Sequence, residues 1–169
     1  AMLTSLPLDT GWRLGIISTD EDEALSNTTF PLVPGDDITE ATAALNALSS
    51  SSYYGPAGEA GFESVYAYME LGAYSTSWMR QSAALLIVFV SDEDEQTYLQ
   101  PPIGNQMLVD AVNGAPNTKL YTFALPFYGW DELAVDAGGE AFALTNNSAQ
   151  MYNDLMSIID AACLPREGE

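Results

Sequence analysis

The 169-residue sequence has no histidine, one cysteine and only four basic residues. Without histidine, the usual Ser-His-Asp and Cys-His constellations of nucleophilic catalysis are unavailable. The single cysteine, Cys163, cannot form a disulfide bond within the chain. No apolar run approaches the roughly 18 residues that indicate a membrane-spanning helix. We therefore expect neither triad chemistry nor direct insertion into a membrane.

The few basic residues face 24 acidic ones, so the formal net charge is −20. Nucleic acids and anionic lipid headgroups are bound by lysine and arginine, so we expect neither as a partner. A cationic partner, divalent ions or a saline medium fits the charge better. Acid-rich, lysine-poor surfaces are also typical of proteins from halophilic or marine sources, and that interpretation explains most of the acids without giving any of them a function.

The most informative segment is residues 84–95, with the sequence ALLIVFVSDEDE. An apolar run without alternation is typical of a parallel strand that helices cover on both faces. In open α/β sheets, ligands bind just beyond the carboxyl ends of such strands. The acidic residues that follow Ser91 are therefore predicted to lie at the edge of the sheet where ligands bind.

A second candidate strand, residues 12–18, also runs into acidic residues, at positions 20–23. Carboxylate oxygens are the preferred ligands of hard cations such as Mg²⁺ and Ca²⁺. If a cation binds, we expect Asp92, Asp94 and Asp20 to hold it. The alternative interpretation is that these carboxylates are solvated or cap helices.

The remaining pattern alternates helices with strands. Helices are predicted at 38–48, where Asp37 or Thr39 is the N-cap, and after Asn147 or Ser148, where the inner stripe includes Leu155 and Ile158. The other predicted elements are a short extended segment at 28–33, helices at 59–72 and 104–112, a strand at 119–125 and a short edge strand after Gly138-Gly139. This order predicts one domain, residues 1–169, with an α/β fold: a three-layer α/β/α sandwich around a mostly parallel sheet.

The order of these elements resembles a von Willebrand factor type A (VWA) domain of the bacterial secreted or surface type. Residues 12–20, 84–95 and 119–125 match the second, fourth and fifth strands of that family, and the predicted edge strand with the last helix matches its ending. The family's first strand carries an Asp-x-Ser-x-Ser metal motif, which this sequence does not contain. The resemblance implies a Rossmann-like topology, a domain that is incomplete on its N-terminal side, and a degenerate or weak cation site in which only Asp92 matches the family's ligands.

From the resemblance we expect a non-enzymatic protein-binding or adhesion domain. It would lie outside the cell, at the cell surface or in the periplasm, within a larger surface or pilus-assembly protein. The expected cofactor is Mg²⁺ or Ca²⁺ if any, and the expected partner is a protein. A dimer formed by strand exchange is expected if a second chain supplies the central strand.

Two alternatives remain open at this stage. One is a small Mg²⁺-dependent α/β enzyme of a hydrolase-like kind, although phosphate-handling sites normally supply lysine or arginine beside the metal. The other is a purely structural acidic domain from a halophilic or marine source.

Overall fold

The computed structural model describes residues 11–15, 32–37, 39, 42–43, 61–66, 69, 83–92, 94, 96, 105–115, 118–124 and 129–163. Three parallel strands form an open sheet in the order β1-β2-β3. They are β1 (Leu85–Ser91), β2 (Thr118–Ala124) and β3 (Glu140–Ala143). The helices with described bounds are α3 (Gly61–Tyr66), α4 (Asn105–Gly114), α5 (Trp130–Asp136) and α6 (Ser148–Cys163). The chain therefore has an α/β fold, as the sequence predicts.

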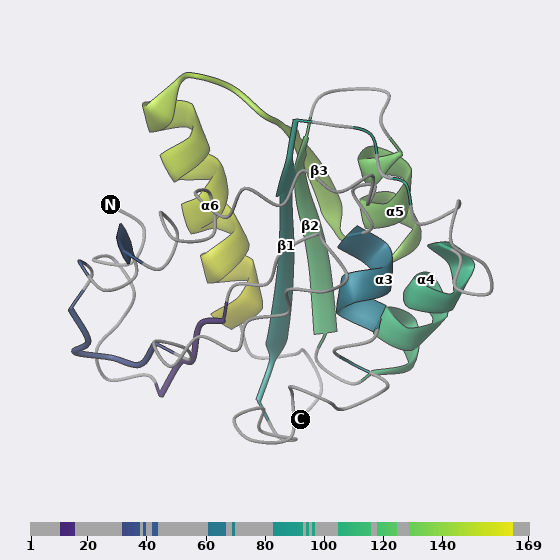
Figure 1. Ribbon diagram of the computed structural model, residues 1–169, viewed down its shortest axis with the longest axis horizontal. Coiled ribbons are helices and arrows are strands. Elements are labelled where there is room, and N and C mark those ends of the chain that lie inside the picture. The colour runs from purple at the N-terminus through teal and green to yellow at the C-terminus, as the bar shows by residue number, and fades with distance from the viewer. Residues whose placement is uncertain are drawn as a thin grey trace.

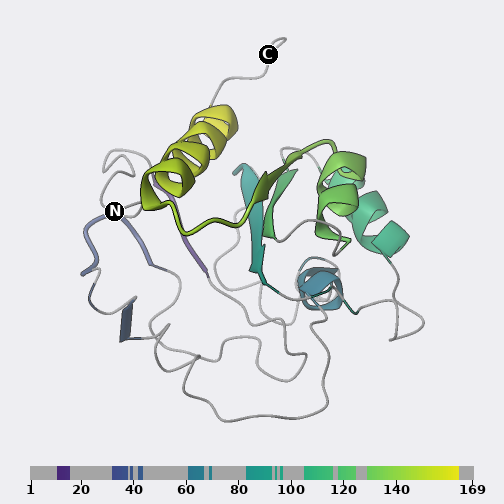
Figure 2. The same ribbon diagram turned by 90° about the horizontal axis from the view of Figure 1, so that it is seen from above.

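Helices lie on both faces of this sheet (Figures 1 and 2). The helices α3, α4 and α5 lie on one face, and α6 lies on the other. The helices α4 and α5 connect successive strands that advance in one direction across the sheet, and crossovers of one hand place such helices on the same face. The core is divided accordingly, because Leu120 of β2 packs with the first group of helices while Tyr121 and Phe123 pack with Ile158 of α6.

The register of the sheet brings the carboxyl ends of the strands together. Leu85 lies opposite Thr118, and Ser91 lies opposite Ala124. The shorter β3 pairs with the second half of β2, so that its last residue, Ala143, also lies opposite Ala124. We call this side of the sheet, where all three strands end, the carboxyl edge.

Three aromatic side chains join α3, β1 and α5. The ring centroids of Phe62 and Phe89 are 5.6 Å apart, and Trp130 lies 5.2 Å from Phe62 and 5.0 Å from Phe89. A Cβ atom at Gly61 would lie 2.7 Å from the Trp130 ring, so only glycine allows this approach. Trp130 and Phe62 are fully buried, and edge-on aromatic contacts of this kind stabilise a core beyond simple burial.

The turn between α5 and β3 passes close to the backbone of β2. Gly138 has a φ of 70°, a conformation that favours glycine, and its N–H donates to the Val135 carbonyl. The next residue, Gly139, donates its N–H to the Ala134 carbonyl at 2.8 Å. A Cβ atom at Gly139 would overlap the carbonyl oxygen of Leu120. The chain therefore needs glycine here for a close approach of two backbones.

Most of the elements predicted over the described residues are present. The apolar run at 84–90 forms β1, and the strands predicted at 119–125 and after Gly138-Gly139 are β2 and β3. The prediction of Asn147 as an N-cap is confirmed, since its Oδ1 accepts the N–H groups of Ala149 and Gln150, each at 3.2 Å. Asp37 likewise accepts the N–H of Thr39 at 2.9 Å, and Thr39 has helical backbone.

Two predictions about strands need correction. The strand predicted at 12–18 is not formed over its described residues, 12–15, where Leu14 instead makes an isolated antiparallel bridge with Leu32 through N–H···O bonds of 3.0 and 2.9 Å. The remaining residues of that segment, 16–18, lie outside the described part. The second correction concerns β1, which is not buried on both faces, because the Val90 side chain is 59% exposed. The cluster that α6 forms with Tyr121 and Phe123 of β2 does not include Val90.

The helix α5 was not predicted from the sequence at all. It is only 7 residues long, and its N-cap is Gly129, which makes no side-chain capping hydrogen bond. None of the helices in the described ranges combines the length and hydrophobicity that crossing a membrane requires.

Candidate functional site

The carboxyl edge exposes two of the three acidic residues nominated as cation ligands. The strand β1 ends at Ser91, whose side chain is buried, and Asp92 follows directly with an exposed side chain. Asp94, two residues further along the chain, is also exposed. Both carboxylates therefore lie just beyond the end of a parallel strand, where α/β folds usually bind their ligands.

The structure does not assemble a cation site from these residues. Asp20 lies outside the described residues, and so do the acidic residues at 93 and 95. Within the described ranges, no three Cys, Asp or Glu side chains are placed close enough to hold a metal ion. Asp92 and Asp94 could supply two carboxylate ligands, so a complete site would need further ligands from elsewhere.

An exposed apolar side chain stands next to these carboxylates. Val90 precedes Asp92 by two residues, and its side chain is 59% exposed. Met107, in the first turn of α4, is 38% exposed and belongs to the helix that begins after the carboxyl end of β1. Apolar contact area with flanking charges is the kind of surface that protein partners use. Sequence analysis missed Val90, because an uninterrupted apolar run gives no sign of which residue remains uncovered.

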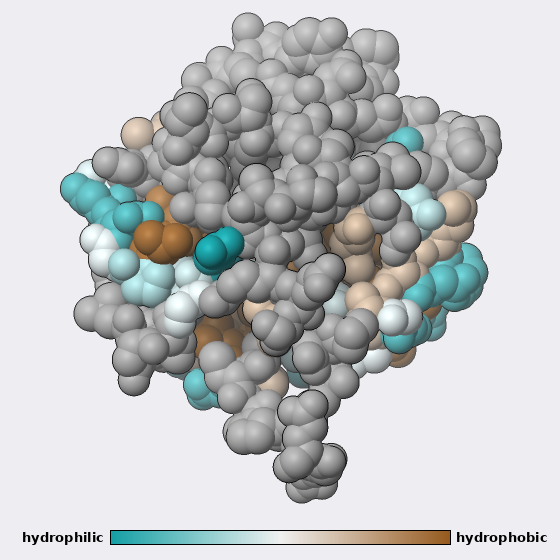
Figure 3. All heavy atoms as spheres, turned by 90° about the horizontal axis from the view of Figure 1, so that it is seen from below, coloured by the Kyte–Doolittle hydropathy of each residue, from teal (hydrophilic) through white to brown (hydrophobic). Residues whose placement is uncertain are grey.

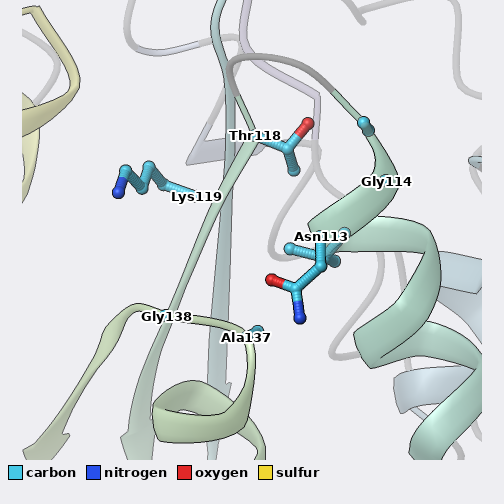
Figure 4. Close-up of a pocket in the computed structure, with 8 residues that line it drawn as sticks. Asn113, Gly114, Thr118, Lys119, Ala137 and Gly138 are labelled. Carbon is cyan, nitrogen blue, oxygen red and sulfur yellow. The ribbon is translucent and has the colours of Figure 1, made fainter. Parts of the chain in front are cut away.

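A cavity of about 320 Å³ lies at the opposite, amino edge of the sheet (Figure 4). It is formed by the end of α4, the start of β2 and the turn after α5, and it is lined by Asn113, Thr118 and Gly138 among others. Asn113 donates from Nδ2 to the Asp136 carbonyl at 3.3 Å. Lys119 also borders the cavity, but Figure 4 shows its ammonium group on the other side of β2, pointing away from Asn113.

The backbone groups around this amino-edge cavity are largely used in ending the two helices. Ala115 N–H donates to the carbonyls of Ala111 and Val112 at 3.0 and 3.3 Å. At the end of α5, the carbonyl of Leu133 accepts from Ala137 at 2.9 Å. Bonds of this type satisfy the last carbonyls of a helix. The cavity is therefore a junction between two capped helix ends, with few groups left to recognise a ligand.

Acidic residues predominate among the exposed charged residues that the structure describes. Asp131, Glu132 and Asp136 are all exposed on α5, where Val135 between them is 65% exposed. None of α4, α5 and α6 has a basic residue in its last turn, where a positive charge would complement the helix dipole. On the face shown in Figure 3, the hydrophobic groups of the described residues occupy small separate areas between hydrophilic ones. Charge rather than a broad apolar patch characterises this surface.

Among the described residues, two titratable groups have pKa values shifted by identifiable contacts, and neither is at the carboxyl edge. Hydrogen bonds from the backbone and side chain of Thr39 lower the pKa of Asp37. Burial raises the pKa of Tyr121, and the nearby carboxylate of Glu140 raises it further. Asp37 caps a helix and Tyr121 belongs to the core beneath α6, so both shifts arise from structural roles.

These observations define an α/β protein with a parallel sheet whose carboxyl edge exposes two carboxylates and an apolar side chain. Comparison with protein-family models and with curated proteins gave no match.

Proposed function

We propose that this chain is a non-enzymatic protein-binding domain that engages its partner at the carboxyl edge. The observation that carries the proposal is the exposure of Val90, Asp92 and Asp94 together at the end of β1. An exposed valine beside two carboxylates offers apolar contact and charge on one surface, and both contribute to recognition of a protein.

The arrangement of strands supports a VWA-like interpretation of this domain. Each of β1, β2 and β3 pairs in parallel with its neighbour in the chain, and α6 then packs on the face opposite α4 and α5 (Figure 1). This is the order in which the resemblance matches the family's last strands and last helix. By the same resemblance, we propose a role in adhesion or in assembly of a surface structure, outside the cell or in the periplasm.

The composition favours binding over catalysis. The chain has no histidine, and its four basic residues leave little positive charge for stabilising anionic substrates or transition states. The amino-edge cavity lies away from Asp92 and Asp94. A weak Mg²⁺ or Ca²⁺ site that uses these two carboxylates belongs to the proposal, with Asp20 as a further ligand.

Site-specific photo-crosslinking in the source cell tests this function. A photoreactive residue would replace Asp92 in one version of the protein and Asp160 in a control, which is exposed near the end of α6. We expect discrete protein adducts from position 92 and none of the same mass from position 160. Equal adduct patterns from both positions, or no adducts from position 92, would contradict binding at the carboxyl edge.

A further inference from the structure

We infer that the outer edge of β1 binds an extended segment of a partner protein, one with alternating apolar residues and with lysine or arginine where it passes Asp92 and Asp94. This inference rests on the proposed function, because it assigns the chemistry of the protein partner. The mode is addition of a strand to a sheet edge, in which backbone hydrogen bonds give affinity and alternate side chains give specificity.

The burial of β1 indicates that the described residues leave one of its faces incompletely covered. On the side that faces α3, α4 and α5, Ile87 and Phe89 are 9% and 6% exposed. Side chains alternate between the two faces of a strand, so Val90 shares the other face with Leu86 and Val88. Leu86 and Val88 are only half-buried against the α6 cluster, and Val90 is 59% exposed. The apolar residues of β1, Leu85–Val90, are thus better covered on the face toward α3, α4 and α5 than on the other face.

The position of β1 in the sheet explains this incomplete cover. Over the part of the chain that the structure describes, β1 pairs only with β2, so it stands at one end of the order β1-β2-β3. The central strand β2, by contrast, is buried at every position from Leu120 to Ala124. An added strand would lie about 4.8 Å from β1, close enough for its side chains to cover Val88 and Val90. Long apolar edges of this kind associate readily with other strands.

Charge favours a basic partner segment over a second copy of the chain at the outer edge of β1. Asp92 and Asp94 are exposed where an added strand would pass the end of β1. The formal net charge of −20 makes a second copy of the same chain electrostatically unfavourable, whereas a segment with basic residues is attracted. A basic partner segment is therefore favoured over a dimer formed by strand exchange.

Fluorescence anisotropy with synthetic peptides tests the inference. The probe is a labelled peptide of alternating valine and threonine, as long as the 7-residue β1, followed by two lysines. A second peptide carries the lysines before the alternating segment, and a third carries two glutamates in place of the lysines. We expect saturable binding of one lysine peptide and at least about ten-fold weaker binding of the glutamate peptide. The lysine peptide that binds reports whether the added strand runs parallel or antiparallel to β1.

Val90→Lys and Val135→Lys form a matched pair of variants. Both introduce the same charge at an exposed valine, 59% exposed on β1 and 65% exposed on α5. We expect Val90→Lys to weaken peptide binding at least about ten-fold and Val135→Lys to change it less than about two-fold. Absence of saturable binding, or equal losses in the two variants, would overturn the inference, because equal losses mean general charge attraction.

Light scattering of the protein alone tests whether a second copy of the chain occupies the outer edge of β1. A dimer that Val90→Lys dissociates would identify a second copy at this edge and would overturn the choice of a basic partner segment.

Failure of this inference is also distinguishable from failure of the proposed function. Adducts from position 92 without peptide binding would reject only the β1 edge, whereas loss of both signals would reject protein binding at this end of the sheet.

Discussion

Gly139→Ala is the substitution that the structure predicts to be most damaging. Gly139 lies between α5 and β3, and its N–H donates to the Ala134 carbonyl at 2.8 Å. The added Cβ would overlap the carbonyl oxygen of Leu120 and lie 2.8 Å from its carbonyl carbon. Both atoms belong to the backbone of β2, the central strand, so no side-chain rotation relieves the clash. Either the turn must move away from β2, or β2 must shift within the sheet.

The expected cost exceeds that of an ordinary overpacked core, which is about 1–3 kcal/mol. Moving the turn would also separate β3 from β2, which it pairs with from Glu140 opposite Tyr121 onward. Loss of this pairing would expose the stacked rings of Phe123 and Phe142, whose centroids are 5.1 Å apart. We therefore expect a loss of about 4 kcal/mol or more in the free energy of unfolding, which is a large part of the roughly 5–15 kcal/mol typical of a domain.

Urea unfolding monitored by tryptophan fluorescence, together with thermal unfolding, measures this cost. For a chain of this size, we expect a fall in Tm of roughly 8–16 °C. Gly114→Ala is the matched control, since no atom outside its chain neighbours and its own helix backbone lies within 4 Å of a Cβ built at the end of α4. It should leave stability unchanged or raise it by up to about 1 kcal/mol, because alanine is the better helix former. Equal Tm values for Gly139→Ala and Gly114→Ala would refute the reasoning.

Three further predictions concern other positions. The Thr122 side chain is 1% exposed and its hydroxyl has no hydrogen-bond partner among the described residues, so Thr122→Val should raise the free energy of unfolding by about 1–3 kcal/mol. Thr118→Val is the control in urea unfolding, and an equal gain there would contradict the explanation. Because burial raises the pKa of Tyr121, the folded state keeps this proton when the unfolded state loses it, so stability should fall as pH rises above about 10. Tyr121→Phe should reduce this fall of stability with pH. An unchanged slope above about pH 10 would contradict the assignment of the fall to Tyr121. Finally, Mg²⁺ or Ca²⁺ should raise Tm more than NaCl of matched ionic strength does. Asp92→Asn should remove this difference, whereas Asp160→Asn should keep it. An equal response of Tm to all salts would argue against a cation site.

Much of the sheet could be predicted from the sequence because its signals are local. The apolar run that forms β1 and the capping side chain of Asn147 each lie within the element they specify. The helix α5 was missed because it has no such signal. Its N-cap is a glycine with a φ of 80°, and its short acidic sequence forms a helix by burying Trp130, Leu133 and Ala134 against the sheet and α3.

The candidate site was predictable only in part, for a similar reason. The end of the apolar run correctly locates Asp92 and Asp94 beyond β1. The exposure of Val90 depends on which strands stand beside β1 and on where α6 packs, and both are set by residues more than 30 positions away in the chain. An apolar run has the same composition whether its strand is central or at the edge, so its local sequence does not report this difference.

The pairing of each of the three described strands with its nearest neighbour in the chain also has a kinetic consequence. β1 joins β2, and β2 joins β3, each through one crossover that contains a single described helix. Paired residues of β1 and β2 are 33 positions apart in the chain and those of β2 and β3 are 19 apart, so each pairing costs the entropy of closing a loop before its contacts form. We therefore expect formation of this parallel sheet to be the slow step in the folding of the described residues, with α3, which comes earlier in the sequence, packing on the surface that these strands and their two helices form.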